Sequence, residues 1–326
     1  MRLGLKKIAV LTSGGDAPGM NAAIRAVVRY GNAYSFEVTG VNNGYTGLIE
    51  GDFRSVGPRD VSGIIQSGGT ILGSSRSDEF ETEPGRRKAL GNLGNSGIEA
   101  LIVIGGNGSQ TGAHLLNEMG FPVIGIASTI DNDLYGTDQS IGVDTALNII
   151  LEAIDRLKVT ASSHHRAHIV ETMGRNHGYL ALTAGIAGGA EYVVIPEVKT
   201  NPEDIAEVIR DTYRRGKSHC LIVVSEGAYW NAMRLQGHFK ENAQLGFSIR
   251  TTILGHVQRG GAPTAFDRIL ATRIGTAAIK ELQAGRSGAL LGLACGEIVA
   301  TPYADVVGHK KTLDLSILET AEKLAR

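Results

Sequence analysis

Two acidic residues stand where they could handle a proton and a metal ion. Asp131 and Asp133 belong to Thr129-Ile130-Asp131-Asn132-Asp133, which directly follows a short apolar run. On an extended segment, side chains at i and i+2 point the same way, which would suit shared work on a Mg²⁺ ion and a proton. The pair could also be an Asx-rich turn or a helix cap. Because it follows a predicted buried strand in a glycine-rich chain, we interpret it as functional.

Two glycine-rich turns could hold a polyphosphate. The first is Ser13-Gly14-Gly15-Asp16, and the second is Gly105-Gly106-Asn107-Gly108-Ser109; each follows an apolar run and precedes a helical pattern. Backbone N–H groups and the helix dipole make such a turn a site for anions, although an isolated Gly-Gly pair is more often an ordinary turn. The 44 glycines of the 326-residue chain exceed the average share of about 7%, and they cluster at turns. Their distribution therefore favours repeated backbone contacts with an anionic ligand.

Other phosphate and nucleotide motifs fit poorly. Gly216-Lys217-Ser218 has Asp211 where a P-loop needs glycine, and it precedes a strand instead of following one. The Gly106-x-Gly108-x-x-x-Gly112 spacing differs from a dinucleotide fingerprint, so a dehydrogenase is weakly supported. The histidines, including His164 and His165, form no zinc-like pattern.

Several arginines lie in or beside predicted loops and not on polar helix stripes. These are Arg76, Arg166, Arg175, Arg250 and Arg259. A single loop arginine is usually a solvated charge, but guanidinium groups near glycine turns suit bidentate capture of phosphate. Their number favours phosphorylated ligands.

The elements that must position these residues alternate between strand and helix. Predicted strands are 8–12, 37–41, 100–104, 123–126, 168–172, 192–195 and 220–224, and predicted helices are 20–30, 83–97, 110–119, 145–158, 179–187, 202–215 and 265–284. This order predicts an α/β fold of two interleaved lobes, each a mostly parallel sheet flanked by helices. Ligands of such sheets bind beyond the carboxyl ends of strands, where the polar motifs stand.

Composition excludes several classes of protein. With 32 Lys+Arg against 33 Asp+Glu, no global field would hold nucleic acid or an anionic membrane. No apolar stretch reaches the roughly 18 residues of a membrane span, so we expect a cytoplasmic protein. The two cysteines, Cys220 and Cys295, lack metal-ligand spacing and are interpreted as buried thiols.

From about Lys7 to its C-terminal helix, the chain resembles the bacterial 6-phosphofructokinases. The likeness rests on motifs that match in order and spacing: residues 13–21, Gly68-Gly69-Thr70, residues 129–133, Glu171-Thr172-Met173-Gly174-Arg175 and residues 255–261. It implies a glycolytic kinase that transfers the γ-phosphate of ATP to the 1-hydroxyl of fructose 6-phosphate. It also implies Mg²⁺ as cofactor, allosteric control and a homotetramer with shared active sites.

The resemblance assigns roles to residues at matching positions. Asp131 would be the general base, with Thr129 and Asp133 beside it, and Arg175 would meet the transferring phosphoryl group. The nucleotide would be held by Gly15, Arg76, Ser77, Gly106, Asn107, Gly108 and Ser109. The sugar phosphate would contact Thr129, Ile130, Asp131, Arg166, Met173, Gly174, Arg175, Glu226, Arg250, His256, Val257, Gln258 and Arg259, with Arg166 and Arg250 supplied by a neighbouring subunit. The metal would be near Asn107, Asp131 and Asp133.

The implied domain arrangement is discontinuous. Residues 1–142 with about 259–310 would form the nucleotide-binding lobe, and residues 143–258 with about 311–326 the sugar-phosphate-binding lobe. An effector pocket would include Arg25, Lys158, Glu191, Arg215 and Lys217. Pro58 and Gly63 replace the expected Arg and Asp there, which predicts a weak or altered effector response.

Two further departures concern the phosphoryl donor. Asn107 stands where the family has Asp, so one carboxylate directed at Mg²⁺ is missing, although an amide oxygen can still ligate. Gly108 favours ATP over pyrophosphate, whereas Ser128 is neither the glycine of ATP users nor the lysine of pyrophosphate users. A pyrophosphate-dependent or dual-donor enzyme therefore stays open, and a non-enzymatic sugar-phosphate-binding module is the remote alternative.

Overall fold

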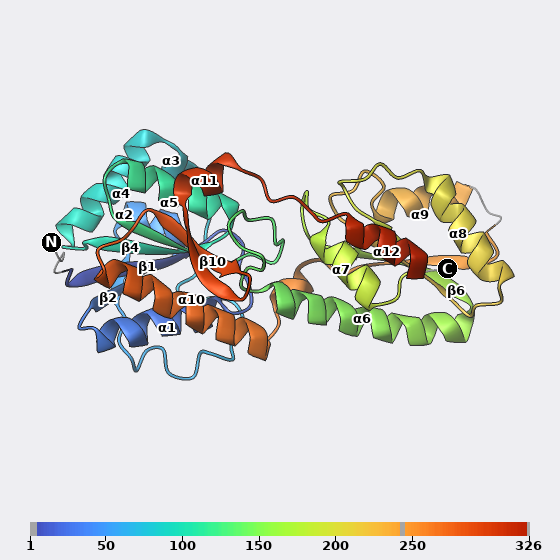
Figure 1. The fold of residues 1–326 in the computed structure, drawn as a ribbon, viewed down its shortest axis with the longest axis horizontal. Helices are drawn as coiled ribbons and strands as arrows, with labels where there is room; N and C mark the ends of the chain where they lie inside the picture. Colours follow the sequence, from blue (N-terminus) through green and yellow to red (C-terminus); the bar gives the residue numbers. More distant parts are fainter. Residues whose placement is uncertain (1–4, 242–244, 325–326) are drawn as a thin grey trace. The chain divides into compact units, whose positions relative to one another are not determined.

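The computed structural model describes residues 5–241 and 245–324. The chain divides into two compact units, each assembled from two separate stretches of sequence. The first unit contains Met1–Thr145 and Arg259–Lys311, and the second contains Ala146–Gln258 and Thr312–Arg326 (Figure 1).

A seven-stranded, mostly parallel sheet forms the centre of the first unit. Its strand order is β11-β10-β5-β4-β1-β2-β3. The strands are β1 (Lys7–Ser13), β2 (Glu37–Val41), β3 (Phe53–Ser55), β4 (Ala100–Gly105), β5 (Val123–Ala127), β10 (Ala289–Ala294) and β11 (Glu297–Pro302). The inner strands pair in parallel, and only β3 and β11 at the two edges are antiparallel to their neighbours.

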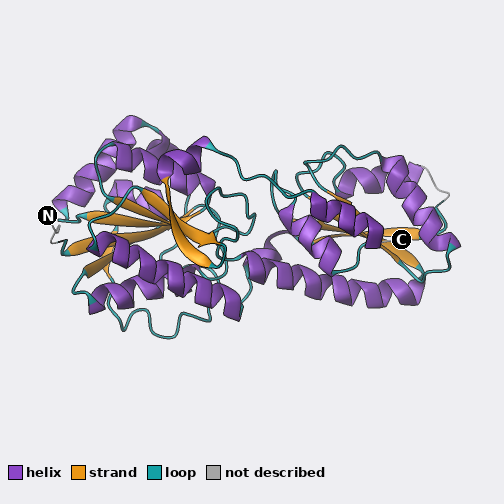
Figure 2. Ribbon diagram, viewed as in Figure 1, coloured by secondary structure: helices purple, strands orange, loops and turns teal. Residues whose placement is uncertain are grey.

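Helices cover both faces of this sheet (Figure 2). They are α1 (Met20–Ala33), α2 (Gly44–Glu50), α3 (Asp78–Glu81), α4 (Glu83–Asn95), α5 (Asn107–Glu118), α10 (Ala265–Gln283) and α11 (Tyr303–Gly308). Helices α1 and α10 pack on each other on one face, and the others lie on the opposite face (Figure 1). Because both faces are covered, β4 and β5 carry no polar side chain along their whole length, and every residue of these two strands is buried.

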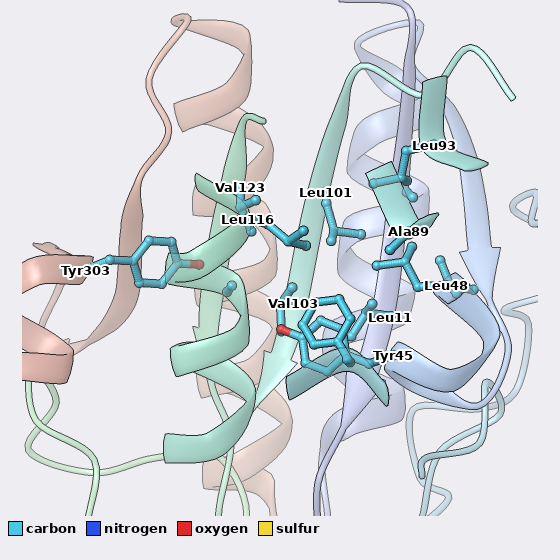
Figure 3. Packing of buried hydrophobic residues seen from close by; sticks show 14 of the residues in the cluster. Leu11, Tyr45, Leu48, Ala89, Leu93, Leu101, Val103, Leu116, Val123 and Tyr303 are labelled. Carbon is cyan, nitrogen blue, oxygen red and sulfur yellow. The ribbon is translucent and has the colours of Figure 1, made fainter. Parts of the chain in front are cut away.

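The core of the first unit extends to the strand ends that carry the glycine turns. Leu11 of β1 and Val103 of β4 lie beside Tyr45 of α2, and Leu101 of β4 belongs to the same cluster (Figure 3). The Tyr45 ring stacks on Phe80 with 3.9 Å between centroids. Burial raises the pKa of the Tyr45 hydroxyl well above its ordinary value, so it stays protonated and donates to the Ser109 carbonyl at 2.6 Å. The core thereby holds the second glycine turn in place.

A four-stranded parallel sheet forms the centre of the second unit, in the order β7-β8-β6-β9. Its strands are β6 (Arg166–Thr172), β7 (Tyr192–Val194), β8 (Cys220–Ser225) and β9 (Ser248–Ile253). The accompanying helices are α6 (Val143–His164), which starts three residues before this unit, α7 (Tyr179–Ala187), α8 (Pro202–Arg214), α9 (Ala232–Glu241) and α12 (Ser316–Leu324). The short 3₁₀ helix η1 (Gly255–Arg259) follows β9. The prediction of mostly parallel sheets flanked by helices is confirmed.

The prediction that both cysteines are buried is wrong for Cys295. Cys220 is buried in β8, but Cys295 is exposed. Ala294 pairs with Glu297 in the β10–β11 hairpin, so Cys295 and Gly296 form a two-residue turn. Their φ angles are 49° and 82°, as a type I′ turn requires, and such a turn projects its side chain into solvent.

Candidate active site

Three neighbouring strands of the first unit end together and bring the three predicted motifs to one edge. Strands β1, β4 and β5 are adjacent and parallel. Ser13 at the end of β1 pairs with Gly105 at the end of β4, and Gly105 pairs with Ala127 at the end of β5. The first glycine turn, the second glycine turn and the segment 129–133 therefore leave the sheet side by side.

Close approaches between these turns explain why glycine occupies them. A Cβ at Gly14 would lie 3.2 Å from Ser109 Oγ, so the two glycine turns touch. A Cβ at Gly105 would lie 2.6 Å from the Ser13 carbonyl oxygen, a separation that real Cβ atoms do not show. At Gly106, a Cβ would lie 3.2 Å from Thr129 Cβ, which joins the second turn to the acidic segment. Gly108 has open space instead, with no atom within 4 Å of a Cβ placed there.

The side chains of Arg259 and Ser74 contact the first glycine turn. A Cβ at Gly15 would lie 3.0 Å from Arg259 Cζ, so the Arg259 guanidinium covers this glycine. Ser74 donates its hydroxyl to the Gly14 carbonyl at 2.6 Å, and exposed Arg76 follows two residues later. Ser77 caps helix α3 by accepting from Phe80 N at 3.3 Å, a structural role that sequence reasoning missed.

The acidic segment bends at Ile130 and Asp131 and is not an extended strand. Asn132 has φ 52°, in the left-handed region, which breaks the alternation of side chains expected between Asp131 and Asp133. The premise that the two carboxylates point the same way because the segment is extended is therefore wrong. Asp131 is 4% exposed, and its N–H donates to Thr129 Oγ1 at 3.2 Å. Asp133 is half-buried.

Oxygen ligands suited to Mg²⁺ gather around this turn. Asn107, the first residue of α5, donates its amide Nδ2 to the Asp133 carbonyl at 3.2 Å, so its amide oxygen belongs to the same edge as the two carboxylates. In the described part of the chain, no three His, Cys, Asp or Glu side chains are arranged to hold a metal. Mg²⁺ usually takes only one or two carboxylates and completes its shell with phosphates and water, so the donor set fits it. The assignment of Asn107, Asp131 and Asp133 as ligands stays a prediction.

A second group of predicted residues comes together in the second unit, beyond the ends of β6 and β8. The Arg175 N–H donates to Glu226 Oε1 at 3.0 Å, and the Glu226 N–H donates to the Thr172 carbonyl at 2.9 Å. Arg175 has φ 50° and is exposed. Its backbone is thus held in a sparsely populated conformation at an exposed position.

Gln258 has a structural role that the sequence did not indicate. It is fully buried, its amide oxygen accepts from Met173 N at 3.2 Å, and its amide nitrogen donates to the Gly255 carbonyl at 2.8 Å. It therefore ties the predicted sugar-binding loop after β6 to helix η1. Its neighbours His256 and Val257 are exposed.

The two arginines predicted to act in a neighbouring subunit lie on adjacent strands. Arg166 begins β6 and pairs with Ser248, and Arg250 on β9 pairs with His168. His168 is buried between charged neighbours, and burial followed by the positive charges of Arg166 and Arg250 lowers its pKa. Arg250 is exposed on the edge strand of this sheet.

The predicted effector residues divide between the units. Arg25 lies on α1 of the first unit, and the others belong to the second. There, Lys217 pairs with Glu191 at 3.2 Å, and Lys158 donates to the Gly188 carbonyl at 3.0 Å. Arg215 pairs instead with Asp211 at 2.9 Å. Their role as an effector pocket stays a prediction.

Asp267 supports the site and was missed by sequence reasoning. It is fully buried at the start of α10, where its carboxylate accepts from Gly142 N at 2.9 Å, Thr145 N at 2.8 Å and Thr145 Oγ1 at 2.6 Å. Burial raises its pKa to about 6 against the opposing effect of these hydrogen bonds. Its partners are more than 120 residues distant in sequence, which is why no local pattern revealed it.

Comparison with known proteins identifies the family. A family model described as Phosphofructokinase matches residues 7–282. The chain belongs to the phosphofructokinase family. The ATP-dependent 6-phosphofructokinase 1 of Thermus thermophilus is 51% identical over 323 residues, covering 98% of this chain and 100% of that protein. The ATP-dependent 6-phosphofructokinase of Thermotoga neapolitana is 52% identical over 322 residues, with the same coverage of each chain.

Solved phosphofructokinases share the fold. The Saccharomyces cerevisiae phosphofructokinase matches with a TM-score of 0.86 and 38% identity, covering 98% of this chain but 48% of the yeast chain. A pyrophosphate-dependent phosphofructokinase from Marinobacter aquaeolei matches with a TM-score of 0.86 at 22% identity, covering 96% of this chain and 86% of that one, and shows the fold alone. None of the described helices is both long and apolar enough to cross a membrane.

Proposed function

We propose that the chain is an ATP-dependent 6-phosphofructokinase. It transfers the γ-phosphate of ATP to the 1-hydroxyl of fructose 6-phosphate and releases fructose 1,6-bisphosphate and ADP. The observation that carries this proposal is the meeting of the two glycine turns with the acidic segment, through Gly14 and Ser109, Gly106 and Thr129, and Asn107 and Asp133. Relatives about half identical over their full length are ATP-dependent 6-phosphofructokinases, which supports the same activity.

In this proposal the backbone of the glycine turns and the N-terminus of α5 hold the triphosphate. The free N–H groups of the first turn of a helix attract phosphate oxygens, and the open space at Gly108 leaves room for the ligand. Asp131 accepts the proton of the sugar hydroxyl, and Arg175 stabilises the charge of the transferring group. Mg²⁺, when bound, neutralises charge on the β- and γ-phosphates. Positioning and charge neutralisation supply most of the rate in such a reaction.

ATP is the favoured donor for a local reason. Ser128, the position where pyrophosphate users carry lysine, is fully buried in this chain, and its hydroxyl faces the Ile141 carbonyl at 3.5 Å. The site therefore offers no cation at this position to bind a second phosphate in place of a nucleotide. A pyrophosphate-dependent enzyme would need a positive charge from another residue to bind the second phosphate.

An aldolase-coupled assay with fructose 6-phosphate and Mg²⁺ tests this function. We expect turnover with ATP and at least tenfold lower kcat/KM with pyrophosphate. Greater activity with pyrophosphate would reverse the donor assignment, and absence of product with either donor would leave only a binding module. The homotetramer, the cytoplasmic location and the sugar-phosphate role of the second unit belong to the same proposal; light scattering should give a mass four times that of the chain.

A further inference from the structure

Asn132 lies between the two acidic residues and has an unusual backbone. Its φ of 52° is in the left-handed region, where an L-residue other than glycine carries a conformational cost. The residue is also fully buried, so its amide is removed from water. Such a conformation persists only where surrounding contacts hold it in place, and it often marks a functional site.

Both ends of the Asn132 amide are hydrogen-bonded within the same loop. Its Oδ1 accepts from Ser140 N at 3.2 Å, and its Nδ2 donates to the Asp138 carbonyl at 3.1 Å. Ser140 in turn donates its hydroxyl to the Thr129 carbonyl at 2.7 Å. The loop from Thr129 to Ser140 is thus closed on itself around the Asn132 side chain.

The atoms that Asn132 contacts are anchored to the rest of the first unit. The Asp138 carbonyl also accepts from Lys311 Nζ at 2.8 Å, and Asp138 N donates to the Leu293 carbonyl at 2.6 Å. Next to Ser140, Ile141 N donates to the Ala127 carbonyl at 3.1 Å, at the end of β5. Through these bonds, Asn132 fixes the segment that carries Asp131 relative to the sheet.

We propose that Asn132 is a positioning residue that sets the direction of the Asp131 carboxylate. This inference rests on the proposed function, in which Asp131 receives the proton. Because the backbone turns at Asn132, a small rotation there redirects the residues on both sides. The glycine turn that would bind the nucleotide is held by other contacts, including that of Tyr45 with Ser109. Loss of the amide should therefore reduce the rate of the chemical step and leave nucleotide binding intact.

The substitution Asn132→Gly distinguishes the effect of the side-chain amide from the effect of the backbone conformation. Glycine adopts positive φ without strain, so only the two hydrogen bonds of the side chain are removed. We expect kcat to fall by about 10- to 100-fold, the range expected for misplacement of a catalytic group. The KM for MgATP should stay within about threefold, since uniform binding is not affected. The matched control is Ser35→Gly, an exposed residue with φ 64° in the turn after α1, which should leave both constants unchanged.

The outcomes distinguish this inference from the proposed function. If the wild-type chain does not phosphorylate fructose 6-phosphate, the proposed function fails. If the wild type is active and Asn132→Gly keeps its kcat within about threefold, or loses only nucleotide affinity, the positioning role is wrong. Should Asn132→Gly lack a cooperative melting transition, Asn132→Asp keeps the acceptor for Ser140 N and removes the bond donated to the Asp138 carbonyl, and an unchanged kcat in that variant would likewise contradict the proposal.

Discussion

The amide of Asn107 donates to the carbonyl of Asp133 across 3.2 Å. This contact joins the start of α5, at the second glycine turn, to the segment that carries the proposed base. A carboxylate at position 107 could not make it, because an ionised carboxylate only accepts hydrogen bonds. Asn107 therefore supplies a bond that holds the acidic segment, where an aspartate would supply a negative charge.

The substitution Asn107→Asp should strengthen the binding of Mg²⁺, so that less Mg²⁺ is needed for activity. Adding one negative charge about 4 Å from a divalent ion is worth ~2 kcal/mol in water, which predicts a roughly 30-fold lower half-saturating Mg²⁺ concentration. Initial rates measured against free Mg²⁺ at saturating ATP check this. The control is Asn95→Asp, an exposed amide at the end of α4 that precedes the opposite end of β4. An unchanged or higher half-saturating concentration in Asn107→Asp would argue against a metal near this side chain.

Gly108 and Gly91 offer a matched pair for testing the nucleotide site. A Cβ at either position meets no atom within 4 Å, and both residues lie in exposed helix. Alanine should raise thermal stability slightly at both positions, by up to about 1 kcal/mol. Only Gly108→Ala should impair catalysis, with a KM for ATP raised by about tenfold because the methyl group occupies space left for the ligand. Equal KM values in the two variants would place the nucleotide elsewhere.

Asp267 should make stability depend on pH in the mildly acidic range. Its folded-state pKa, raised to about 6, lies above the ordinary value, so its favourable contribution is present below about pH 4 and is lost as pH rises through about 6. Compared with Asp267→Asn, the wild type should lose roughly 2 kcal/mol of unfolding free energy between pH 4 and pH 7. Urea titrations across this range measure the difference, and Asp155→Asn, an exposed change on α6, should show no such trend. A wild-type advantage that grows with pH would contradict the assignment.

The two thiols should react at very different rates. Cys295 is exposed in its hairpin turn, whereas burial raises the pKa of Cys220 to about 12 and leaves little thiolate to react. A thiol reagent should therefore modify one cysteine quickly and the second only on unfolding. Cys295→Ser should abolish the fast phase. Two fast phases in the wild type would show that β8 opens readily.

Local sequence patterns were sufficient to predict the strands that carry the site. Strands β1, β4 and β5 are short, largely apolar runs followed directly by Gly or Ser, and their pairing places the motifs together as expected. The β10–β11 hairpin and the edge strand β9 were not predicted. Their sequences are interrupted by glycine or polar residues, and their place is set by strands distant in the chain.

Features that depend on single backbone angles or distant partners were also missed. The left-handed conformation of Asn132 reverses the inference drawn from the spacing of Asp131 and Asp133, because spacing predicts side-chain direction only in regular structure. Asp267 could not be recognised as a buried acceptor because its donors are Gly142 and Thr145, far back in the sequence. The sequence marks Asn107 as a departure from the pattern of the resembled family, but its contact with Asp133 depends on the fold.

The most direct test of the account is the turnover number of Asp131→Ser with fructose 6-phosphate and MgATP. Serine removes the carboxylate that would accept the proton and leaves the glycine turns unchanged. The account predicts that kcat falls by about 10²- to 10⁴-fold while fructose 6-phosphate still binds within about threefold of the wild-type affinity. A kcat within about threefold of the wild type would show that another group accepts the proton and would contradict the central role of Asp131.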